Sequence, residues 1–283
     1  MSRIVYVNGA YVPEEEANIS VFDRGFMFAD GIYEVSAVID GKLVDNDAHM
    51  ARLGRSLKMI DVPAPMSDDE IIAMQRELIK RNNLTEGVVY MQITRGAADR
   101  DFVYGKDMKP TLVAFTQVKK LFGSASQENG IAIHVLEDIR WQRRDIKTVM
   151  LLAQVLAKQE ATAHGCQDAW MQEDGYITEG ASSSAFIITA DDHLIVRPNS
   201  NAILPGCTRL AMLKIADELN LVMEERLFTL EEAQNAKEAF QTSASGFVTP
   251  VVKLAGTVIV DGKPGAITRK LQNAYIEIAK ASS

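Results

Sequence analysis

Hydrophobic and polar residues alternate in two segments near the beginning of the chain, each centred on a dipeptide that favours a tight turn. Residues 3–12 alternate around Asn8-Gly9, and residues 33–44 alternate around Asp40-Gly41. Alternation is typical of a strand with one buried face, and Asn-Gly and Asp-Gly are preferred in two-residue hairpin loops. The pattern therefore predicts two β-hairpins in the first part of the chain.

The apolar spacing then changes to that of an amphipathic helix. Apolar residues recur at three- and four-residue intervals over residues 49–60, and Ser67 with Glu70 forms a capping-box pattern before a second periodic segment. These two helices are expected to cover the sheet that the hairpins begin. Apolar residues 88–94 and 111–118 predict two more strands of that sheet.

The pattern after residue 118 predicts a second, larger lobe. Residues 119–130 are rich in Gly, Ser, Gln, Glu and Asn without periodicity, which is typical of a connector. Beyond it we expect a strand over 131–136, strand-turn-strand units over 169–178 and 185–196, and helices over 148–163, 208–220 and 267–279. The pattern thus predicts a mixed α and β chain with domains 1–120 and 131–283, a linker over 121–130, and a ligand site at the domain interface.

The composition agrees with an enzyme that acts on small molecules. The chain has 283 residues, of which 47% are hydrophobic, and it carries a net charge of -8. Nucleic acids and anionic membranes require a basic surface, so neither is an expected partner. The sequence shows no signal-peptide pattern and no apolar run near the ~18 residues of a membrane helix. With only Cys166 and Cys207 as cysteines, the protein is expected to be reduced and cytoplasmic.

Two polar residues at the ends of predicted strands carry the candidate chemistry. Lys147 follows the apolar run 131–136, and Glu179 directly follows the strand-turn-strand unit predicted over 169–178. Lysines that lose their proton form Schiff bases with carbonyl groups, and partial burial beside cations such as Arg143 and Arg144 favours that loss. A carboxylate such as Glu179 can keep a pyridinium nitrogen protonated, so that the ring acts as an electron sink. Lys147 alone would be read as a solvated lysine, but the pair indicates pyridoxal phosphate chemistry.

Four motifs carry a resemblance to a known family. They are Glu137-Asp138-Ile139-Arg140-Trp141, Asp145-Ile146-Lys147, Val155-Leu156-Ala157-Lys158-Gln159-Glu160-Ala161 and Thr178-Glu179-Gly180. In their order and spacing the chain resembles the fold-type IV pyridoxal phosphate aminotransferases (class IV), and it is most similar to the bacterial D-amino acid aminotransferases. The resemblance covers almost the whole chain. It implies an α+β fold with a small N-terminal α/β domain and a larger C-terminal domain that contains a pseudo-barrel sheet.

The resemblance also implies the residues that hold pyridoxal 5'-phosphate. Arg52 would bind the phosphate by charge, although without the resemblance it would be read as a solvated helix arginine. The turn containing Gly206, Cys207 and Thr208 opens a predicted helix, whose first N–H groups and hydroxyl would bind the same phosphate. Leu204 would pack on the face of the ring.

A second phosphate contact is implied in the turn before Thr249-Pro250, and there the sequence departs from the family. Ala244 stands where the D-amino acid enzymes usually carry a threonine. Either its backbone N–H serves alone, or Ser243 or Ser245 supplies the hydroxyl. Since one neutral hydrogen bond contributes about 1 kcal/mol, we expect weaker but not abolished retention of the cofactor.

Substrate recognition is implied for the strand that contains Tyr33 and Val35 and for a loop that contains Arg100. Tyr33 would bind the substrate carboxylate by its hydroxyl, and Arg100 of the neighbouring subunit would bind it with a guanidinium fork. From the residues alone, Tyr33 could equally be a cross-strand packing residue, and Arg100 a loop arginine paired with Asp99 or Asp101. Phe102 is a second departure, since the best-known D-amino acid enzymes carry a histidine there. One polar arm of the carboxylate site would thus be missing.

The implied reaction is a ping-pong transamination through pyridoxamine phosphate. A D-amino acid such as D-alanine would be the donor and a 2-oxo acid such as 2-oxoglutarate the acceptor. Lys147 would anchor the cofactor as a Schiff base and then move the proton between Cα and the cofactor's C4′. Alternatives are a branched-chain L-amino acid aminotransferase, an aminodeoxychorismate lyase, an (R)-amine transaminase and a catalytically silent homologue.

Because Arg100 would act across an interface, a homodimer with a shared site is expected. The histidines, His49, His134, His164 and His193, are scattered without metal-ligand spacing, so no metal site is predicted.

Overall fold

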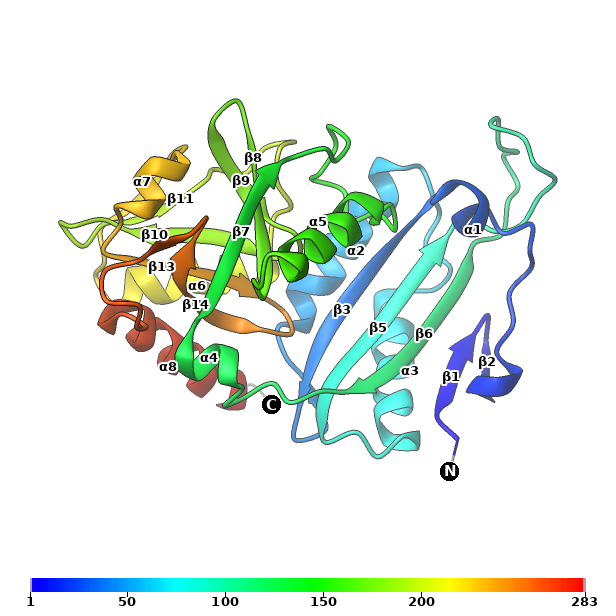
Figure 1. The fold of residues 1–283 in the computed structure, drawn as a ribbon. Helices are drawn as coiled ribbons and strands as arrows, with labels where there is room; N and C mark the ends of the chain where they lie inside the picture. The colour runs from blue at the N-terminus through cyan, green and yellow to red at the C-terminus, as the bar shows by residue number, and fades with distance from the viewer. Residues whose placement is uncertain (1, 282–283) are drawn as a thin grey trace. The chain divides into compact units, whose positions relative to one another are not determined.

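A six-stranded antiparallel sheet contains both predicted hairpins in the computed structural model, which describes residues 2–281 (Figure 1). In Asn8-Gly9 and Asp40-Gly41 both residues have positive φ, between 48° and 100°, as the tightest hairpin turns require. The strand order is β2-β1-β6-β5-β3-β4. The bounds are β1 (Ile4–Val7), β2 (Ala10–Pro13), β3 (Gly31–Ile39), β4 (Lys42–Leu43), β5 (Glu86–Thr94) and β6 (Thr111–Val118).

Two predicted helices pack against this sheet. They are α2 (Asn46–Met59) and α3 (Asp68–Arg81), and shorter segments are η1 (Glu14–Glu16) and α1 (Arg24–Phe28). The predicted capping box is present, because Ser67 Oγ accepts the N–H of Glu70 and Glu70 Oε2 accepts the N–H of Ser67 at 2.8 Å. Buried apolar residues of both helices, such as Leu53 and Leu78, form one core with Ile32 and Met91 of the sheet.

Residues 146–150 belong to the same compact unit as residues 2–120, although they are distant in sequence. Thr148 forms an isolated bridge with Ile32 of β3, and the N–H of Val149 donates to Gly31 O at 3.1 Å. These backbone bonds prevent a helix from starting at residue 148. The prediction of a helix over 148–163 is therefore wrong at its beginning, since α5 covers only Leu152–Ala163.

The second unit, residues 121–145 and 151–281, is built on a nine-stranded sheet. Its path is β12-β11-β10-β13-β14-β7-β8-β9, and β15 pairs with β14. The end strand β9 contacts β10 near the other end of the path, so the sheet curls into a half-barrel. The bounds are β7 (Ile131–Glu137), β8 (Asp168–Glu173), β9 (Tyr176–Gly180), β10 (Ser184–Ile188), β11 (Leu194–Val196), β12 (Met223–Glu225), β13 (Glu238–Ser243), β14 (Phe247–Leu254) and β15 (Thr257–Val258).

Five helices accompany this sheet in the part of the chain that the structure describes. They are α4 (Ala125–Asn129), α5 (Leu152–Ala163), α6 (Cys207–Glu218), α7 (Leu230–Gln234) and α8 (Ala266–Ala281). The predicted mixed α and β fold is confirmed, whereas α4 lies in the segment that was predicted to be irregular. Among residues 2–281, no helix combines the length and the apolar character that crossing a membrane requires.

Candidate active site

Lys147 is held by the backbone of β3 rather than by the strand that precedes it in sequence. The N–H of Tyr33 donates to the Lys147 carbonyl at 3.0 Å, and Lys147 Nζ lies 4.0 Å from the centroid of the Tyr33 ring. The prediction that the run 131–136 delivers Lys147 is wrong, because β7 ends at Glu137 and an irregular segment follows it. A main-chain bond to β3, at a part of the strand that β4 does not cover, therefore positions the lysine.

The arginines predicted to favour loss of the Lys147 proton are both paired with carboxylates. Arg143 Nε donates to Asp145 Oδ1 at 3.0 Å, and the buried Arg144 donates through Nη1 to Glu173 Oε2 at 2.8 Å. Their positive charge is thus largely compensated within the second unit.

Tyr33 belongs to a row of aromatic rings on one face of the first sheet. Its ring stacks on that of Tyr90 at 5.6 Å, which in turn stacks on Phe115 at 4.8 Å. Burial is the larger cause and the charge of the nearby Tyr33 the smaller cause that raise the pKa of Tyr90 to about 12. The Tyr90 hydroxyl therefore stays protonated and donates to Gln92. Strand alternation places Val35 on the same face as Tyr33. Tyr33 is therefore a cross-strand packing residue as well as a candidate substrate ligand.

On the opposite face of β3, Glu34 forms a buried ionic cluster with two residues of α2. Arg52 donates through Nε and Nη2 to the two Glu34 oxygens at 2.7 Å each, and His49 Nδ1 lies 2.8 Å from Glu34 Oε2. Burial alone would raise the pKa of Glu34, but the charge and hydrogen bonds of Arg52 and His49 outweigh it and lower that pKa to about 2. Arg52 is thus buried and ion-paired, and it is not the solvated helix arginine that the sequence alone would indicate.

Arg100 lies among aromatic rings in an exposed loop of the first unit. Its guanidinium carbon is 5.5 Å from the Phe28 ring centroid and 5.6 Å from that of Phe102. Hydrogen bonds from α1 hold the backbone of this loop, since Arg24 donates to the carbonyls of Asp101 and Phe102. Phe102 is 76% exposed, so its ring is available at the surface of this unit.

In the second unit, Glu179 at the end of β9 is fixed by Arg140 and by the loop before α6. Arg140 Nη1 donates to Glu179 Oε1 at 2.6 Å, and the N–H of Leu204 donates to the same oxygen at 3.1 Å. Arg140 is held in turn by Asp138, which accepts from its Nε and Nη2 at 2.9 and 2.7 Å. Burial raises the pKa of Glu179, and Arg140 opposes that rise. The carboxylate therefore depends on Arg140 for its charge.

The start of α6 has the features of an anion-binding site. Its N-cap residue Gly206 provides no side-chain cap, so first-turn N–H groups of this twelve-residue helix point outward next to the buried Cys207 and Thr208. A Cβ at Gly206 would come within 2.9 Å of Ser184 Oγ, and Ser184 is paired directly with Thr242 on β13. The Thr242 hydroxyl is buried and has no hydrogen-bond partner among residues 2–281.

The turn between β13 and β14 holds the second predicted phosphate contact. Ser243 Oγ accepts the N–H of Gly246 at 3.0 Å, and its own proton can still be donated. Ala244 is half-buried in this turn. Together with the unpartnered Thr242 hydroxyl and the uncapped helix, these groups fit a phosphate.

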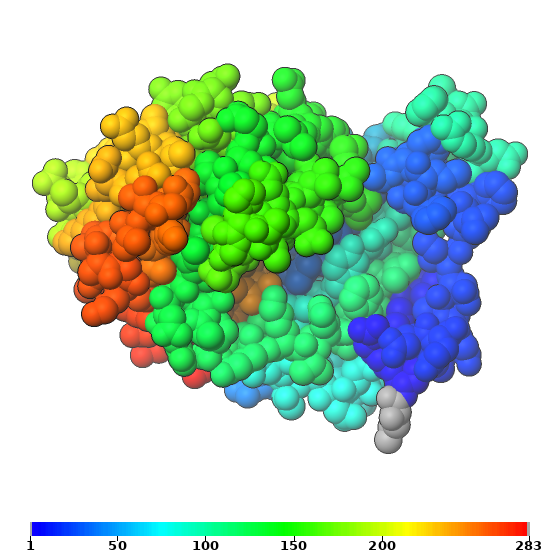
Figure 2. Space-filling model, viewed as in Figure 1, coloured from blue at the N-terminus to red at the C-terminus, as the bar shows by residue number. Residues whose placement is uncertain are grey.

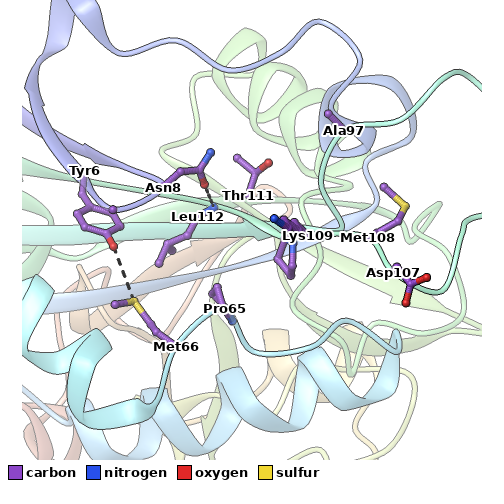
Figure 3. Close-up of a pocket in the computed structure, with 12 residues that line it drawn as sticks. Tyr6, Asn8, Pro65, Met66, Ala97, Asp107, Met108, Lys109, Thr111 and Leu112 are labelled. Carbon is purple, nitrogen blue, oxygen red and sulfur yellow. Dashed lines mark hydrogen bonds between the residues drawn. The ribbon is translucent and has the colours of Figure 1, made fainter.

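A cavity of the first unit is distinct from these residues. It has a volume of about 750 Å³ and is lined by residues of β1, β6 and the loops around Met66 and Lys109 (Figure 3). In it Tyr6 donates to Met66 Sδ, and Asn8 accepts the N–H of Leu112. None of the predicted site residues lines this cavity.

Sequence reasoning missed the residues that hold the site residues in place. Asp138 and Arg140 belong to one of the four family motifs, but the sequence assigned them no function. Glu34, next to Tyr33, was not assigned a function either. Each is a charged residue of low exposure, which one sequence does not reveal because burial depends on segments distant in the chain. The alternation in β3 was the only signal that Glu34 faces inward.

Comparison with known proteins defines the class. Residues 31–254 match the family model described as amino-transferase class IV, so the chain belongs to the class IV aminotransferase family. The resemblance inferred from the motifs is thereby confirmed.

Individual members of known aminotransferase groups resemble this chain to different degrees. The chain is 38% identical over 282 residues to a D-alanine aminotransferase of Staphylococcus aureus, a match that covers 99% of both chains. Among solved structures, the Escherichia coli branched-chain amino acid aminotransferase has a TM-score of 0.90 at 25% identity, over 99% of this chain and 95% of that one. The T.th. branched-chain amino acid aminotransferase, solved with pyridoxamine 5'-phosphate, has a TM-score of 0.89 at 21% identity over the same shares and supports the fold.

Proposed function

We propose that this protein transfers the amino group of a D-amino acid such as D-alanine to a 2-oxo acid such as 2-oxoglutarate. The observation that carries the proposal is the identity to D-alanine aminotransferases, 38% over nearly the full length, against 25% to the branched-chain enzyme. The D-specific class is therefore favoured over the branched-chain alternative.

We infer that pyridoxal 5'-phosphate is the cofactor. A branched-chain amino acid aminotransferase of similar fold was solved with pyridoxamine 5'-phosphate. In this chain the uncapped start of α6, the Thr242 hydroxyl and the Ser243 turn would bind the phosphate, with Arg52 adding positive charge. Glu179 would bind the ring nitrogen and Leu204 would pack on the ring. When bound, the cofactor supplies an electron sink for the electrons of the broken Cα–H bond.

Lys147 is the residue to which we assign proton transfer. Its amine would take the proton from the substrate Cα and return it on the neighbouring carbon of the cofactor. The backbone bond from Tyr33 fixes the Lys147 main chain, so only the side chain has to move. Glu179 has to remain ionised for its role, and Arg140 stabilises that charge against burial.

Recognition of the substrate carboxylate is assigned to the Tyr33 hydroxyl and the Arg100 guanidinium. Two parallel N–H donors match a carboxylate well, which favours amino acids over simple amines. Phe102 has no polar group, so the carboxylate site has one hydrogen-bond donor fewer than in enzymes that carry histidine at this position. We therefore expect a raised KM rather than loss of activity.

A homodimer is part of the proposal. Phe26, Phe102 and Val103 of the first unit are 74%, 76% and 80% exposed, and such apolar side chains are typical of a surface that a partner covers. A second copy that covers this loop would receive Arg100 into its own site. Sedimentation velocity of the purified protein measures the assembly directly.

The deciding experiment compares two amino acids on the purified, cofactor-loaded protein without any 2-oxo acid. Loss of the visible absorption band of the lysine-bound cofactor with D-alanine, and not with L-leucine, supports the proposal. Reaction with L-leucine alone would reassign the protein to the branched-chain group.

Assays on the same purified protein distinguish two other enzyme classes from a D-amino acid aminotransferase. A lyase would release pyruvate from 4-amino-4-deoxychorismate without an amino acceptor. An (R)-amine transaminase would convert (R)-1-phenylethylamine faster than D-alanine, since it needs no carboxylate site. Steady pyruvate formation from D-alanine only when 2-oxoglutarate is present excludes the lyase, and slower conversion of (R)-1-phenylethylamine than of D-alanine excludes the amine transaminase.

A further inference from the structure

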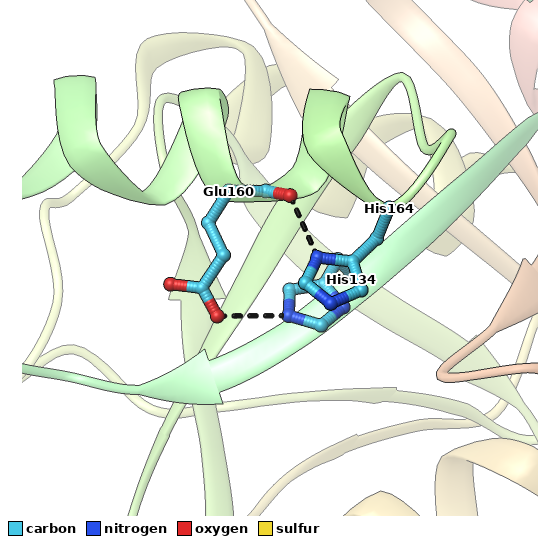
Figure 4. Close-up of side chains that lie close together, drawn as sticks. All are labelled: His134, Glu160 and His164. Atoms are coloured by element: carbon cyan, nitrogen blue, oxygen red, sulfur yellow. Dashed lines mark hydrogen bonds and ion pairs between the residues drawn. The ribbon is translucent and has the colours of Figure 1, made fainter.

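Two histidines and a glutamate meet on the surface of the second unit, where α5 lies beside β7. His134 is on β7, Glu160 lies in the last turn of α5, and His164 is the C-cap residue that directly follows this helix (Figure 4). One possible ligand atom from each residue lies within 4.8 Å of the others. These histidines are distant in sequence, which is why their spacing predicted no metal site.

The hydrogen bond of His164 defines which of its nitrogens can bind a metal. His164 Nδ1 lies 2.9 Å from the carbonyl oxygen of Glu160. A carbonyl oxygen only accepts, so Nδ1 carries the proton and Nε2 of the neutral ring presents a lone pair. Metal-bound histidines have this arrangement, in which a carbonyl orients the ring through the nitrogen that does not bind the metal.

The distance between the other two ligand atoms suits one ion. His134 Nε2 lies 3.2 Å from Glu160 Oε1. Two ligand atoms at ~2.0–2.2 Å from a tetrahedral zinc ion are separated by about 3.3 Å. A cation can therefore take the place of the proton that now joins this pair.

Binding requires one local rearrangement. The imidazole rings of His134 and His164 are stacked, with centroids 4.2 Å apart and planes inclined by 10°. Stacked rings cannot both direct an in-plane lone pair at one ion, so the His134 ring has to turn about χ2 while the His164 ring keeps its bond to the Glu160 carbonyl. The χ2 torsion of histidine has a broad energy profile, and the exposed Glu160 side chain can follow the turned ring.

We propose that His134, Glu160 and His164 form a site for a borderline divalent transition-metal ion such as Zn²⁺, with water in the fourth position. Two imidazoles and one carboxylate select such an ion over Mg²⁺ or Ca²⁺, which prefer all-oxygen ligands. Figure 2 shows α5, in green, on the surface of the unit, so a hydrated ion can reach the site. The bound ion would join α5 to β7. This proposal is independent of the proposed function.

The test is a calorimetric titration of ZnCl₂ into the full-length, cofactor-loaded protein after removal of trace metals by EDTA. We expect one ion per chain, affinity at least tenfold weaker in His134→Gln and in His164→Gln, and no comparable binding of MgCl₂. A saturating hundredfold excess over Kd should raise the midpoint of thermal unfolding of the wild type by about 5 °C.

The matched control is His193→Gln. His193 Nδ1 forms a similar, partly exposed pair with Glu224 at 2.6 Å, and within residues 2–281 this pair belongs to no three-residue cluster of possible metal ligands. This variant should bind zinc like the wild type. Absent binding, or binding of equal affinity in the wild type and in His134→Gln and His164→Gln, overturns the proposal. If either variant fails to fold, Glu160→Gln replaces it, with the same tenfold criterion.

Discussion

Lys147 and Tyr33 contact each other through both backbone and side chain: the Tyr33 N–H donates to the Lys147 carbonyl at 3.0 Å, and Lys147 Nζ lies 4.0 Å from the Tyr33 ring centroid. The same strand thus positions the proposed proton-transfer residue and a proposed substrate ligand. Because the main-chain bond does not involve the side chains, substitution of either side chain tests chemistry without removing the attachment.

Replacing Lys147 with Ala should abolish transamination. The amine that moves the proton is lost, and the measured rate of pyruvate formation from D-alanine and 2-oxoglutarate should fall at least a thousandfold. Lys80→Ala, at an exposed position on α3, is the control and should keep wild-type activity. Appreciable turnover by the Lys147 variant would refute its assigned role.

Replacing Arg140 with Gln should make activity dependent on pH. Burial already raises the pKa of Glu179, and removal of Arg140 removes the charge that opposes it. The pKa of Glu179 would then rise further, so a larger fraction of this carboxyl group would be protonated, and kcat should fall and then recover as pH rises. Arg143→Gln, whose partner is Asp145, should leave the kcat profile unchanged. A uniform loss of kcat at all pH values would indicate a purely structural role.

Stability should fall in acid through Glu34. Its pKa is lowered to about 2 from the ordinary 4.5, so its contribution is present above pH 4.5 and is lost as pH falls from 4.5 towards 2. The difference corresponds to about 3 kcal/mol. Urea unfolding of Glu34→Gln at pH 7 should show a loss of about that size, and a smaller difference from wild type near pH 2.

Glu77→Gln is the matched control for this ion pair. Glu77 pairs with Arg81 at 2.7 Å in the same unit, but both side chains are partly exposed. Exposed pairs of this spacing contribute about 0.3–0.5 kcal/mol. Equal losses in Glu34→Gln and Glu77→Gln would contradict the strong stabilisation assigned to the buried cluster.

Replacing Phe102 with His should lower the KM for D-alanine. The histidine would add a polar donor beside Arg100, whose guanidinium now lies 5.6 Å from the Phe102 ring centroid. One hydrogen bond to a carboxylate contributes about 1.5–3 kcal/mol, so we expect KM to fall at least about tenfold with kcat little altered. Steady-state kinetics with D-alanine measure it; an unchanged KM would mean that this loop does not reach the substrate carboxylate.

Introducing a hydroxyl with Ala244→Thr should slow cofactor loss. A threonine there adds a donor to the turn in which Ser243 Oγ already accepts the Gly246 N–H. One hydrogen bond to a charged phosphate contributes about 1.5–3 kcal/mol, so dissociation of pyridoxal phosphate during dialysis should slow at least about tenfold. Ala244→Val, of similar volume without a hydroxyl, should not slow it.

Local patterns predicted most elements because their signals act over a few residues. Asn8-Gly9 and Asp40-Gly41 direct hairpin turns, and Ser67 with Glu70 caps α3, without help from distant parts of the chain. The strand at 247–254 was missed for the opposite reason. Pro250 lies inside β14, which has neighbours on both sides, although proline is normally confined to edge strands.

The sequence by itself determined the family, the candidate lysine and carboxylate, and the elements whose periodicity is local. The tertiary structure alone decided that residues 146–150 pair with β3, that Arg140 is the partner of Glu179, and that His134 meets α5. The reason is physical: burial and ion pairing depend on segments far apart in the chain, and local periodicity carries no record of which segments those are.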